Sequence, residues 1–173
     1  DLIALSKQQG FSGIAEFDQG CCRWVRYIDY QPKQATEDIG VLHWEGDLLI
    51  EDGVDQSYRD EWKRIDDGDG DYTALVLTRN GEPYRAAEWK ASLVIAGDYF
   101  IYTHNRSIPL LSLSSLTDCI ASSNDSQQQI DYLSCEISFG LCRSGQLPWE
   151  VLRSTYPWRE GTPLWSQSDL TVD

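Results

Sequence analysis

Short segments in which apolar and polar residues alternate follow one another along most of the chain, a pattern typical of β-strands. The longest such segment is 21–32, CCRWVRYIDYQP, which is rich in Trp, Tyr, Val and Ile and stops at a proline. Because successive side chains of a strand point to opposite faces, Trp24, Arg26 and Tyr30 are predicted to share one face. Both faces of this strand carry bulky residues, so we expect the rest of the sheet to form around it.

The remaining alternating segments predict further strands, and short polar turns separate several of them. The strongest hairpin signal is Asn80-Gly81, because this pair suits a tight two-residue turn. The predicted strands are 11–17, 39–45, 48–51, 58–65, 72–78, 82–95, 99–104, 130–142 and 149–156, with a helical turn as the alternative at 58–65.

One helix is predicted late in the chain, over 110–122, since Leu113, Leu116 and Ile120 recur at helical spacing. A short helix over 1–9 is a second option, ending at Gly10. Residues 123–129 are expected to form a polar linker, and the segment after 156 to wrap around the outside. With about eight to ten strands and no βαβ pattern, the chain is predicted to be all-β, either an antiparallel sandwich or an up-and-down barrel.

Length and charge narrow the range of functions. A chain of 173 residues suits one domain, 1–173, with a full core. The formal charge of −14 would repel nucleic acid and anionic membranes, so neither is expected as a partner. The seven Trp and nine Tyr favour half-buried sheet surfaces and pocket walls.

The five cysteines are odd in number and lack a framework spacing, which predicts reduced thiols and a cytoplasmic location. A Cys22–Cys135 bridge between strands stays open as an alternative. The sequence shows no signal peptide and no apolar run of membrane-spanning length. It also has no Met, so we expect the first residue not to be the natural start.

Several pieces of the chain are distinctive as a set: WVRYIDYQP, DIGVL, GDLLIEDGV, YRDEWKRI and LVIAGDYFIYTHNR, with CEISFG later. Together they resemble a poorly characterised lipocalin-like (calycin) family of bacteria, which has fungal relatives known through a casein-kinase-interacting protein. The resemblance spans most of 11–106 and implies a lipocalin-like β-barrel with an interior cavity and one late α-helix. It carries over no catalytic residue. A more distant resemblance is to the bilin lyases of cyanobacteria, whose local motifs are not found here.

No motif for metal, cofactor or nucleophilic chemistry is complete. Asp67, Asp69 and Asp71 have the spacing of the first ligands of a calcium loop, but Tyr72 stands where that loop needs glycine and Thr78 where it needs glutamate. His43 and His104 are the only histidines and cannot complete a zinc site by themselves. No G-x-S-x-G motif is present, and a Cys–His dyad is less common than inert buried cysteines. No catalytic residue, metal or cofactor is therefore predicted.

Arg26 and Glu136 each lie in the middle of a predicted strand between bulky residues. A charge inside a barrel must be paired, so both could form structural ion pairs or face outward. The functional alternative is an arginine with an aromatic wall that holds an acidic or planar ligand. The residues predicted to bind such a ligand are Trp24, Arg26, Tyr30, His43, Trp62, Tyr102 and Glu136.

Three functions remain open at this point. The first, which we favour, is a barrel that binds a small hydrophobic or planar ligand. The second is an enzyme that acts on a hydrophobic or chromophore-type substrate. The third is a protein-interaction module with a filled barrel. A homodimer is a further option, because the tail with Trp149, Trp158 and Trp165 could cover either a barrel end or a partner subunit.

Overall fold

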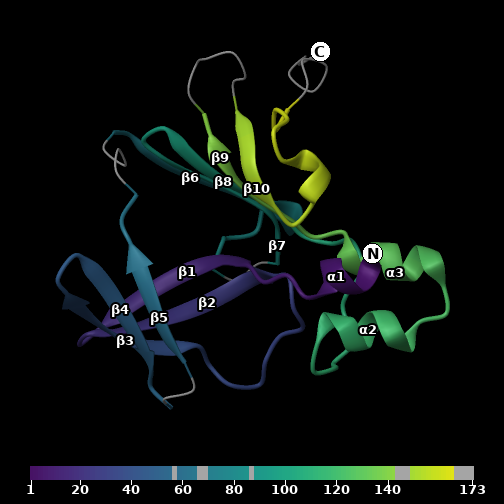
Figure 1. Ribbon diagram of the computed structural model, residues 1–173, viewed down its shortest axis with the longest axis horizontal. Coiled ribbons are helices and arrows are strands. Elements are labelled where there is room, and N and C mark those ends of the chain that lie inside the picture. Colours follow the sequence, from purple (N-terminus) through teal and green to yellow (C-terminus); the bar gives the residue numbers. More distant parts are fainter. Residues whose placement is uncertain (56–57, 66–69, 86–87, 143–148, 166–173) are drawn as a thin grey trace.

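The computed structural model describes residues 1–55, 58–65, 70–85, 88–142 and 149–165. The chain is mostly β and folds into two five-stranded antiparallel sheets, with three helices at one side (Figure 1). Within each sheet, every strand pairs with its neighbour in the chain. The all-β antiparallel prediction is therefore confirmed. A closed barrel is not confirmed, because no described strand of the first sheet pairs with a strand of the second.

Two-residue turns make two of the connections between strands of the first sheet. Gln19 and Gly20 join its first two strands with φ of 47° and 86°, the positive values that a twisted hairpin needs. Gly46, with φ of 63°, makes the turn between the third and fourth strands. The strands are β1 (Phe11–Asp18), β2 (Cys21–Asp29), β3 (Ile39–Glu45), β4 (Leu48–Gly53) and β5 (Arg59–Lys63).

The second sheet has the order β10-β9-β8-β7-β6. The hairpin of β6 and β7 is antiparallel as predicted. Asn80-Gly81 does not form a two-residue turn, because a short 3-10 helix, η1 (Arg79–Gly81), begins a longer loop that extends to Glu88. The apolar and β-branched residues of 72–78 favour a buried strand, yet most of the side chains of this strand are exposed because it lies at the sheet edge. The strands are β6 (Tyr72–Thr78), β7 (Trp89–Ala96), β8 (Tyr99–His104), β9 (Glu136–Leu141) and β10 (Glu150–Ser154).

The helices differ most from the sequence expectation. The short N-terminal helix is confirmed as α1 (Leu2–Ser6), and the late helix α2 (Leu116–Ser122) begins only after its N-cap Ser115. The predicted linker and the start of the predicted strand 130–142 form instead a helix, α3 (Ser126–Leu133). The Asp125 side chain accepts hydrogen bonds from the Gln127 and Gln128 amides and so caps this helix. A last 3-10 turn is η2 (Pro157–Arg159).

The main core lies between the helices and the ends of both sheets, not inside a barrel. Tyr30 at the end of β2 is 1% exposed and donates a hydrogen bond from its hydroxyl to the Leu5 carbonyl of α1. The buried members of this core are Ile28, Tyr30, Trp89, Leu116, Cys119, Ile120, Tyr132, Leu133 and Cys135. A smaller core around Phe100, Val151 and Leu164 lies on the second sheet, where Trp149 and Trp165 pack.

Candidate functional site

A β-bulge in β2 decides which of the predicted site residues can meet. Gly13 pairs with Arg26 and Ser12 with Ile28, so Tyr27 is the extra residue. The prediction that Trp24, Arg26 and Tyr30 share a face is therefore wrong for Tyr30. Beyond the bulge, the alternation is shifted by one residue, so Arg26 and Asp29 share a face and Tyr30 enters the core. Gly13 is needed here, since a Cβ at this position would lie 2.0 Å from the Val25 carbonyl oxygen.

A buried carboxylate brings Trp24 and Trp62 together. Glu51 of β4 is 1% exposed, and its two oxygens accept the indole N–H groups of Trp24 at 2.6 Å and of Trp62 at 3.0 Å. The two indole rings stack with their centroids 5.7 Å apart. Glu51 fits because residue 40 on β3 is glycine, whose missing Cβ would lie 2.3 Å from Glu51 Cγ.

Tyr58 links this carboxylate to a second one. Its hydroxyl lies 3.0 Å from Glu51 Oε1 and 3.0 Å from Asp38 Oδ1. Because a phenol has one proton, it donates to only one of these oxygens at a time. Burial, together with hydrogen bonds to both carboxylates, raises the pKa of Tyr58 far above its usual value.

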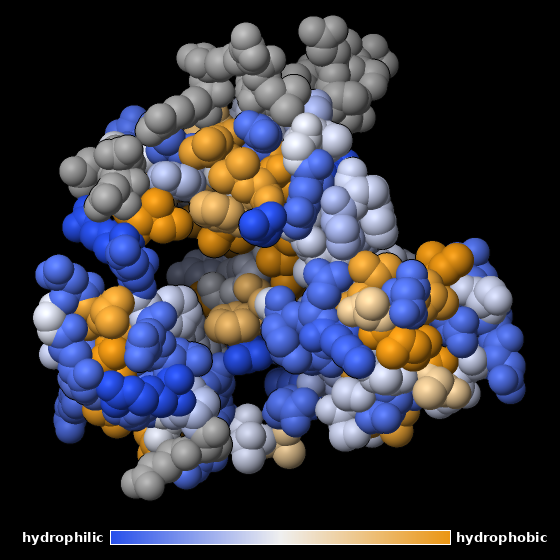
Figure 2. Space-filling view, in the orientation of Figure 1, coloured by the Kyte–Doolittle hydropathy of each residue, from blue (hydrophilic) through white to orange (hydrophobic). Residues whose placement is uncertain are grey.

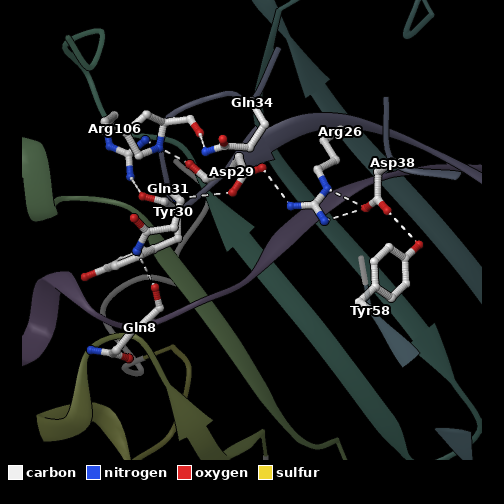
Figure 3. A network of polar contacts seen from close by, with 10 residues as sticks. Gln8, Arg26, Asp29, Tyr30, Gln31, Gln34, Asp38, Tyr58 and Arg106 are labelled. Carbon is white, nitrogen blue, oxygen red and sulfur yellow. Dashed lines mark hydrogen bonds and ion pairs between the residues drawn. The ribbon is translucent and has the colours of Figure 1, made fainter. Parts of the chain in front are cut away.

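Arg26 continues the network on the same face (Figure 3). Its Nε donates to Asp38 Oδ2 at 3.0 Å, and Nη1 donates to Asp29 Oδ2 at 3.1 Å. The guanidinium also lies over the Phe11 ring, 3.9 Å from its centroid. Arg26 is therefore paired and fixed in direction, while its side chain keeps 35% of its exposure.

Two hollows meet at Arg26, and both are lined by Arg26, Asp29 and Lys33. The first has a volume of about 550 Å³ and lies between β2 and the segment 105–112. The second has a volume of about 870 Å³ and is bordered by Trp24 and Tyr58. The first hollow is lined by four cationic residues, Arg26, Lys33, Arg79 and Arg106, against the acidic residues Asp29 and Glu88.

Arg106 was not predicted as a site residue, although it binds three backbone carbonyls in two separate parts of the chain. Its guanidinium donates to the carbonyls of Tyr132 at 3.0 Å, Asp29 at 2.9 Å and Tyr30 at 2.8 Å. Gln31 acts similarly, donating to Ser6 and Gln8 carbonyls and accepting from the Leu116 amide, which lies in the first turn of α2. The sequence offered no signal for either, because both bind backbone groups of distant segments.

The other predicted residues lie outside this cluster. His43 is on the opposite face of the first sheet, where its Nε2 is 3.1 Å from Glu45 and its Nδ1 is 3.8 Å from Asp52. Tyr102 and Glu136 lie together on the second sheet. Glu136 accepts a hydrogen bond from Ser138 at 2.7 Å and lies 3.3 Å from Arg159 Nε, so it is a paired buried charge. The seven predicted residues thus divide among four places.

Three of the five thiols, those of Cys22, Cys119 and Cys135, are fully buried. All five cysteines are free, so the Cys22–Cys135 alternative is wrong. Burial raises the pKa of the Cys135 thiol to about 11, and it also raises those of Cys22 and Cys119. Such thiols stay protonated near neutral pH and are poor nucleophiles.

No group of three or more metal-binding side chains occurs in the ranges that the structure covers. Of the calcium-loop aspartates, Asp67 and Asp69 lie outside the described residues. No helix in the described part of the chain is long and apolar enough to span a membrane. No protein-family model, curated protein or solved structure matches the chain.

Proposed function

We propose that the chain is a lipocalin-like binding module for a small planar ligand that carries an anionic group. The observation that supports this most is the excess of cationic residues around the 550 Å³ hollow, in a chain with twice as many acidic as basic residues. The volume lies within the range of small-molecule sites, about 300–1,000 Å³. The up-and-down order of the ten strands supports the lipocalin-like part of the proposal.

The hollow offers complementary contacts for both halves of such a ligand. Tyr27, Ile108 and Leu110 form an apolar wall beside the cationic groups. Lys33 lies where the two hollows join and has no ion pair or hydrogen bond to any described residue. An anionic ligand would give Lys33 a partner, while Arg26 stays bound to Asp29 and Asp38.

The test begins with native mass spectrometry of protein purified from its source organism, compared with the denatured mass. Excess mass that is lost on denaturation would supply the ligand. Binding of 1-naphthoate, a planar carboxylate, is then measured by calorimetry for the wild type and for Lys33→Glu and Lys63→Glu. Both variants exchange an exposed lysine for a glutamate, but Lys63 lies on β5, away from the hollows.

We expect Lys33→Glu to weaken binding by roughly tenfold or more, since a like charge then faces the anion, and Lys63→Glu to change it less than twofold. Equal effects of the two substitutions would show that only the net charge matters, and would refute the site. The absence of both bound mass and naphthoate binding would refute the proposal.

A second candidate function is protein interaction, and the exposed apolar residues of the second sheet favour it. Figure 2 shows hydrophobic side chains gathered on this sheet, while the first sheet is largely hydrophilic. Large patches of this kind are uncommon on monomers. The exposed apolar residues lie on both faces of this sheet, Tyr72, Val94 and Ile101 on one face and Leu75 and Leu77 on the other.

A further inference from the structure

The balance of charge reverses between the two hollows that meet at Arg26. Among the described residues that line the first hollow, cationic residues outnumber acidic ones by four to two. Those that line the second hollow reverse this balance, with three cationic residues, Arg23, Arg26 and Lys33, against four acidic residues, Asp29, Glu37, Asp38 and Asp55. A ligand at the junction of the hollows therefore has mainly cationic surroundings on one side and mainly acidic surroundings on the other.

Besides Arg26, two residues of opposite charge line both hollows, namely Lys33 and Asp29. Lys33 has no ion pair or hydrogen bond to any described residue. Asp29 is fixed in direction, because its Oδ1 accepts from the Gln31 amide at 3.1 Å and its Oδ2 accepts from Arg26 at 3.1 Å (Figure 3). The Asp29 side chain is still 18% exposed, and a carboxylate can accept about four hydrogen bonds. Asp29 can therefore accept further bonds from a ligand.

Arg26 compensates the charge of Asp29 only in part. The guanidinium lies between two carboxylates and donates to both Asp29 and Asp38. Burial raises the pKa of Asp29, although the hydrogen bond from Arg26 acts to lower it. A further cation at the junction would therefore stabilise the ionised form of Asp29.

We propose that the ligand is an aromatic α-amino acid with free amino and carboxyl groups. Its ring lies in the first hollow against Tyr27, Ile108 and Leu110, its carboxylate pairs with Lys33, and its ammonium group pairs with Asp29. An α-amino acid suits the junction because it carries both charges on one carbon atom, next to its ring. This inference rests on the proposed function, and it adds a cationic group to the planar anion.

The experiment is titration calorimetry of the 173-residue chain with three ligands that share an indole ring. L-tryptophan carries both charges, indole-3-propionate lacks the ammonium group, and tryptamine lacks the carboxylate. The variants are Asp29→Asn and Lys33→Glu, and circular dichroism checks that they fold. The control is Asp60→Asn, which makes the same exchange on β5, outside the described lining of both hollows.

We expect L-tryptophan to bind about tenfold more tightly than either of the other ligands, because each of them lacks one charge-assisted hydrogen bond. Asp29→Asn is expected to weaken tryptophan binding about tenfold, and to leave indole-3-propionate binding unchanged or tighter because Arg26 loses an acidic partner. Lys33→Glu is expected to weaken the binding of tryptophan and indole-3-propionate but not that of tryptamine. Asp60→Asn should change each affinity less than about twofold.

Indole-3-propionate that binds as tightly as L-tryptophan would overturn the inference. So would an equal loss of affinity for both ligands in Asp29→Asn. If Asp29→Asn does not fold, the comparison of the three ligands on the wild type decides by itself. If naphthoate binds and tryptophan has no advantage over indole-3-propionate, this inference fails and the proposed function stands.

Discussion

Removing the half-buried Arg106 guanidinium is predicted to destabilise the protein strongly. The side chain donates to carbonyls of Asp29 and Tyr30 at the end of β2 and of Tyr132 in α3. The Tyr132 carbonyl is among the last four of its helix, which have no partner within the helix. Arg106 therefore joins the first sheet to the helices at three points.

The magnitude follows from these three bonds. A hydrogen bond from a charged donor contributes about 1.5–3 kcal/mol, and water can partly replace Arg106, which is only half-buried. For Arg106→Met, which keeps most of the aliphatic chain, we expect a loss of about 4 kcal/mol in the free energy of unfolding. With a urea dependence of about 2 kcal/mol per M, the unfolding midpoint should fall by roughly 2 M.

The assay is urea unfolding followed by tryptophan fluorescence. Arg106→Lys should lose roughly half as much, because one ammonium cannot reach three carbonyls on two elements. The control is Arg79→Met, whose exposed pair with Glu88 is expected to contribute less than about 0.5 kcal/mol. If Arg106→Met and Arg79→Met shift the midpoint equally, the three bonds do not hold the sheet to the helices.

Three further predictions concern the buried groups. Glu51→Gln should lower the free energy of unfolding by roughly 2–4 kcal/mol, because an amide N–H₂ then faces an indole N–H; the exposed Glu61→Gln is its control in the same urea assay. Gly13→Ala should cost more than about 3 kcal/mol, because the new Cβ meets backbone 2.0 Å away; a cooperative urea transition at the wild-type midpoint would contradict this. Burial raises the pKa of Cys135 to about 11 and those of Tyr30 and Tyr156 to about 12. As the pH rises, the unfolded chain loses these protons before the folded chain does. The contribution of these groups to the free energy of unfolding should therefore be fully present below about pH 8 and be lost as the pH rises from about 9 to 12. Free energies of unfolding that stay constant from about pH 8 to 10.5 would refute this.

The order of the strands could be predicted from the sequence because each strand pairs with its neighbour in the chain. The alternation of residues 11–17 and 39–45, together with the Gly20 and Gly46 turns, is a local signal that tertiary contacts did not override. The same local reading correctly indicated the short N-terminal helix.

The parts of the fold that were predicted wrongly depend on contacts between residues far apart in the sequence, which a local pattern does not contain. The bulge at Tyr27 changes the face of every later residue in β2, so a strict alternation misplaced Tyr30. Residues 126–133 form a helix through an Asp125 cap and burial of Tyr132 and Leu133 against other helices, although their composition reads as a linker followed by a strand.

Trp24 and Trp62 were both among the residues predicted to line a ligand pocket, and in the structure their indole rings stack. The predicted aromatic wall did not include Glu51, whose oxygens bind both indoles. A glutamate in a predicted strand reads as a solvent-facing residue, and only the gap at Gly40 on the next strand makes room for its burial.

Pairing between consecutive strands also has a consequence for how the chain folds. Each sheet is assembled from hairpins whose partners are few residues apart, so little loop entropy is lost when they form. The contacts of the N-terminal residues are of the opposite kind. The Ser6 and Thr117 hydroxyls lie 2.8 Å apart although 111 residues separate them in sequence, and Gln8 donates to the Thr155 carbonyl across 147 residues. We therefore expect the hairpins to be formed in the folding transition state, and the docking of α1 onto α2 and β10 to come after it. Substitutions at Ser6 and Gln8 should then speed unfolding and leave the folding rate nearly unchanged.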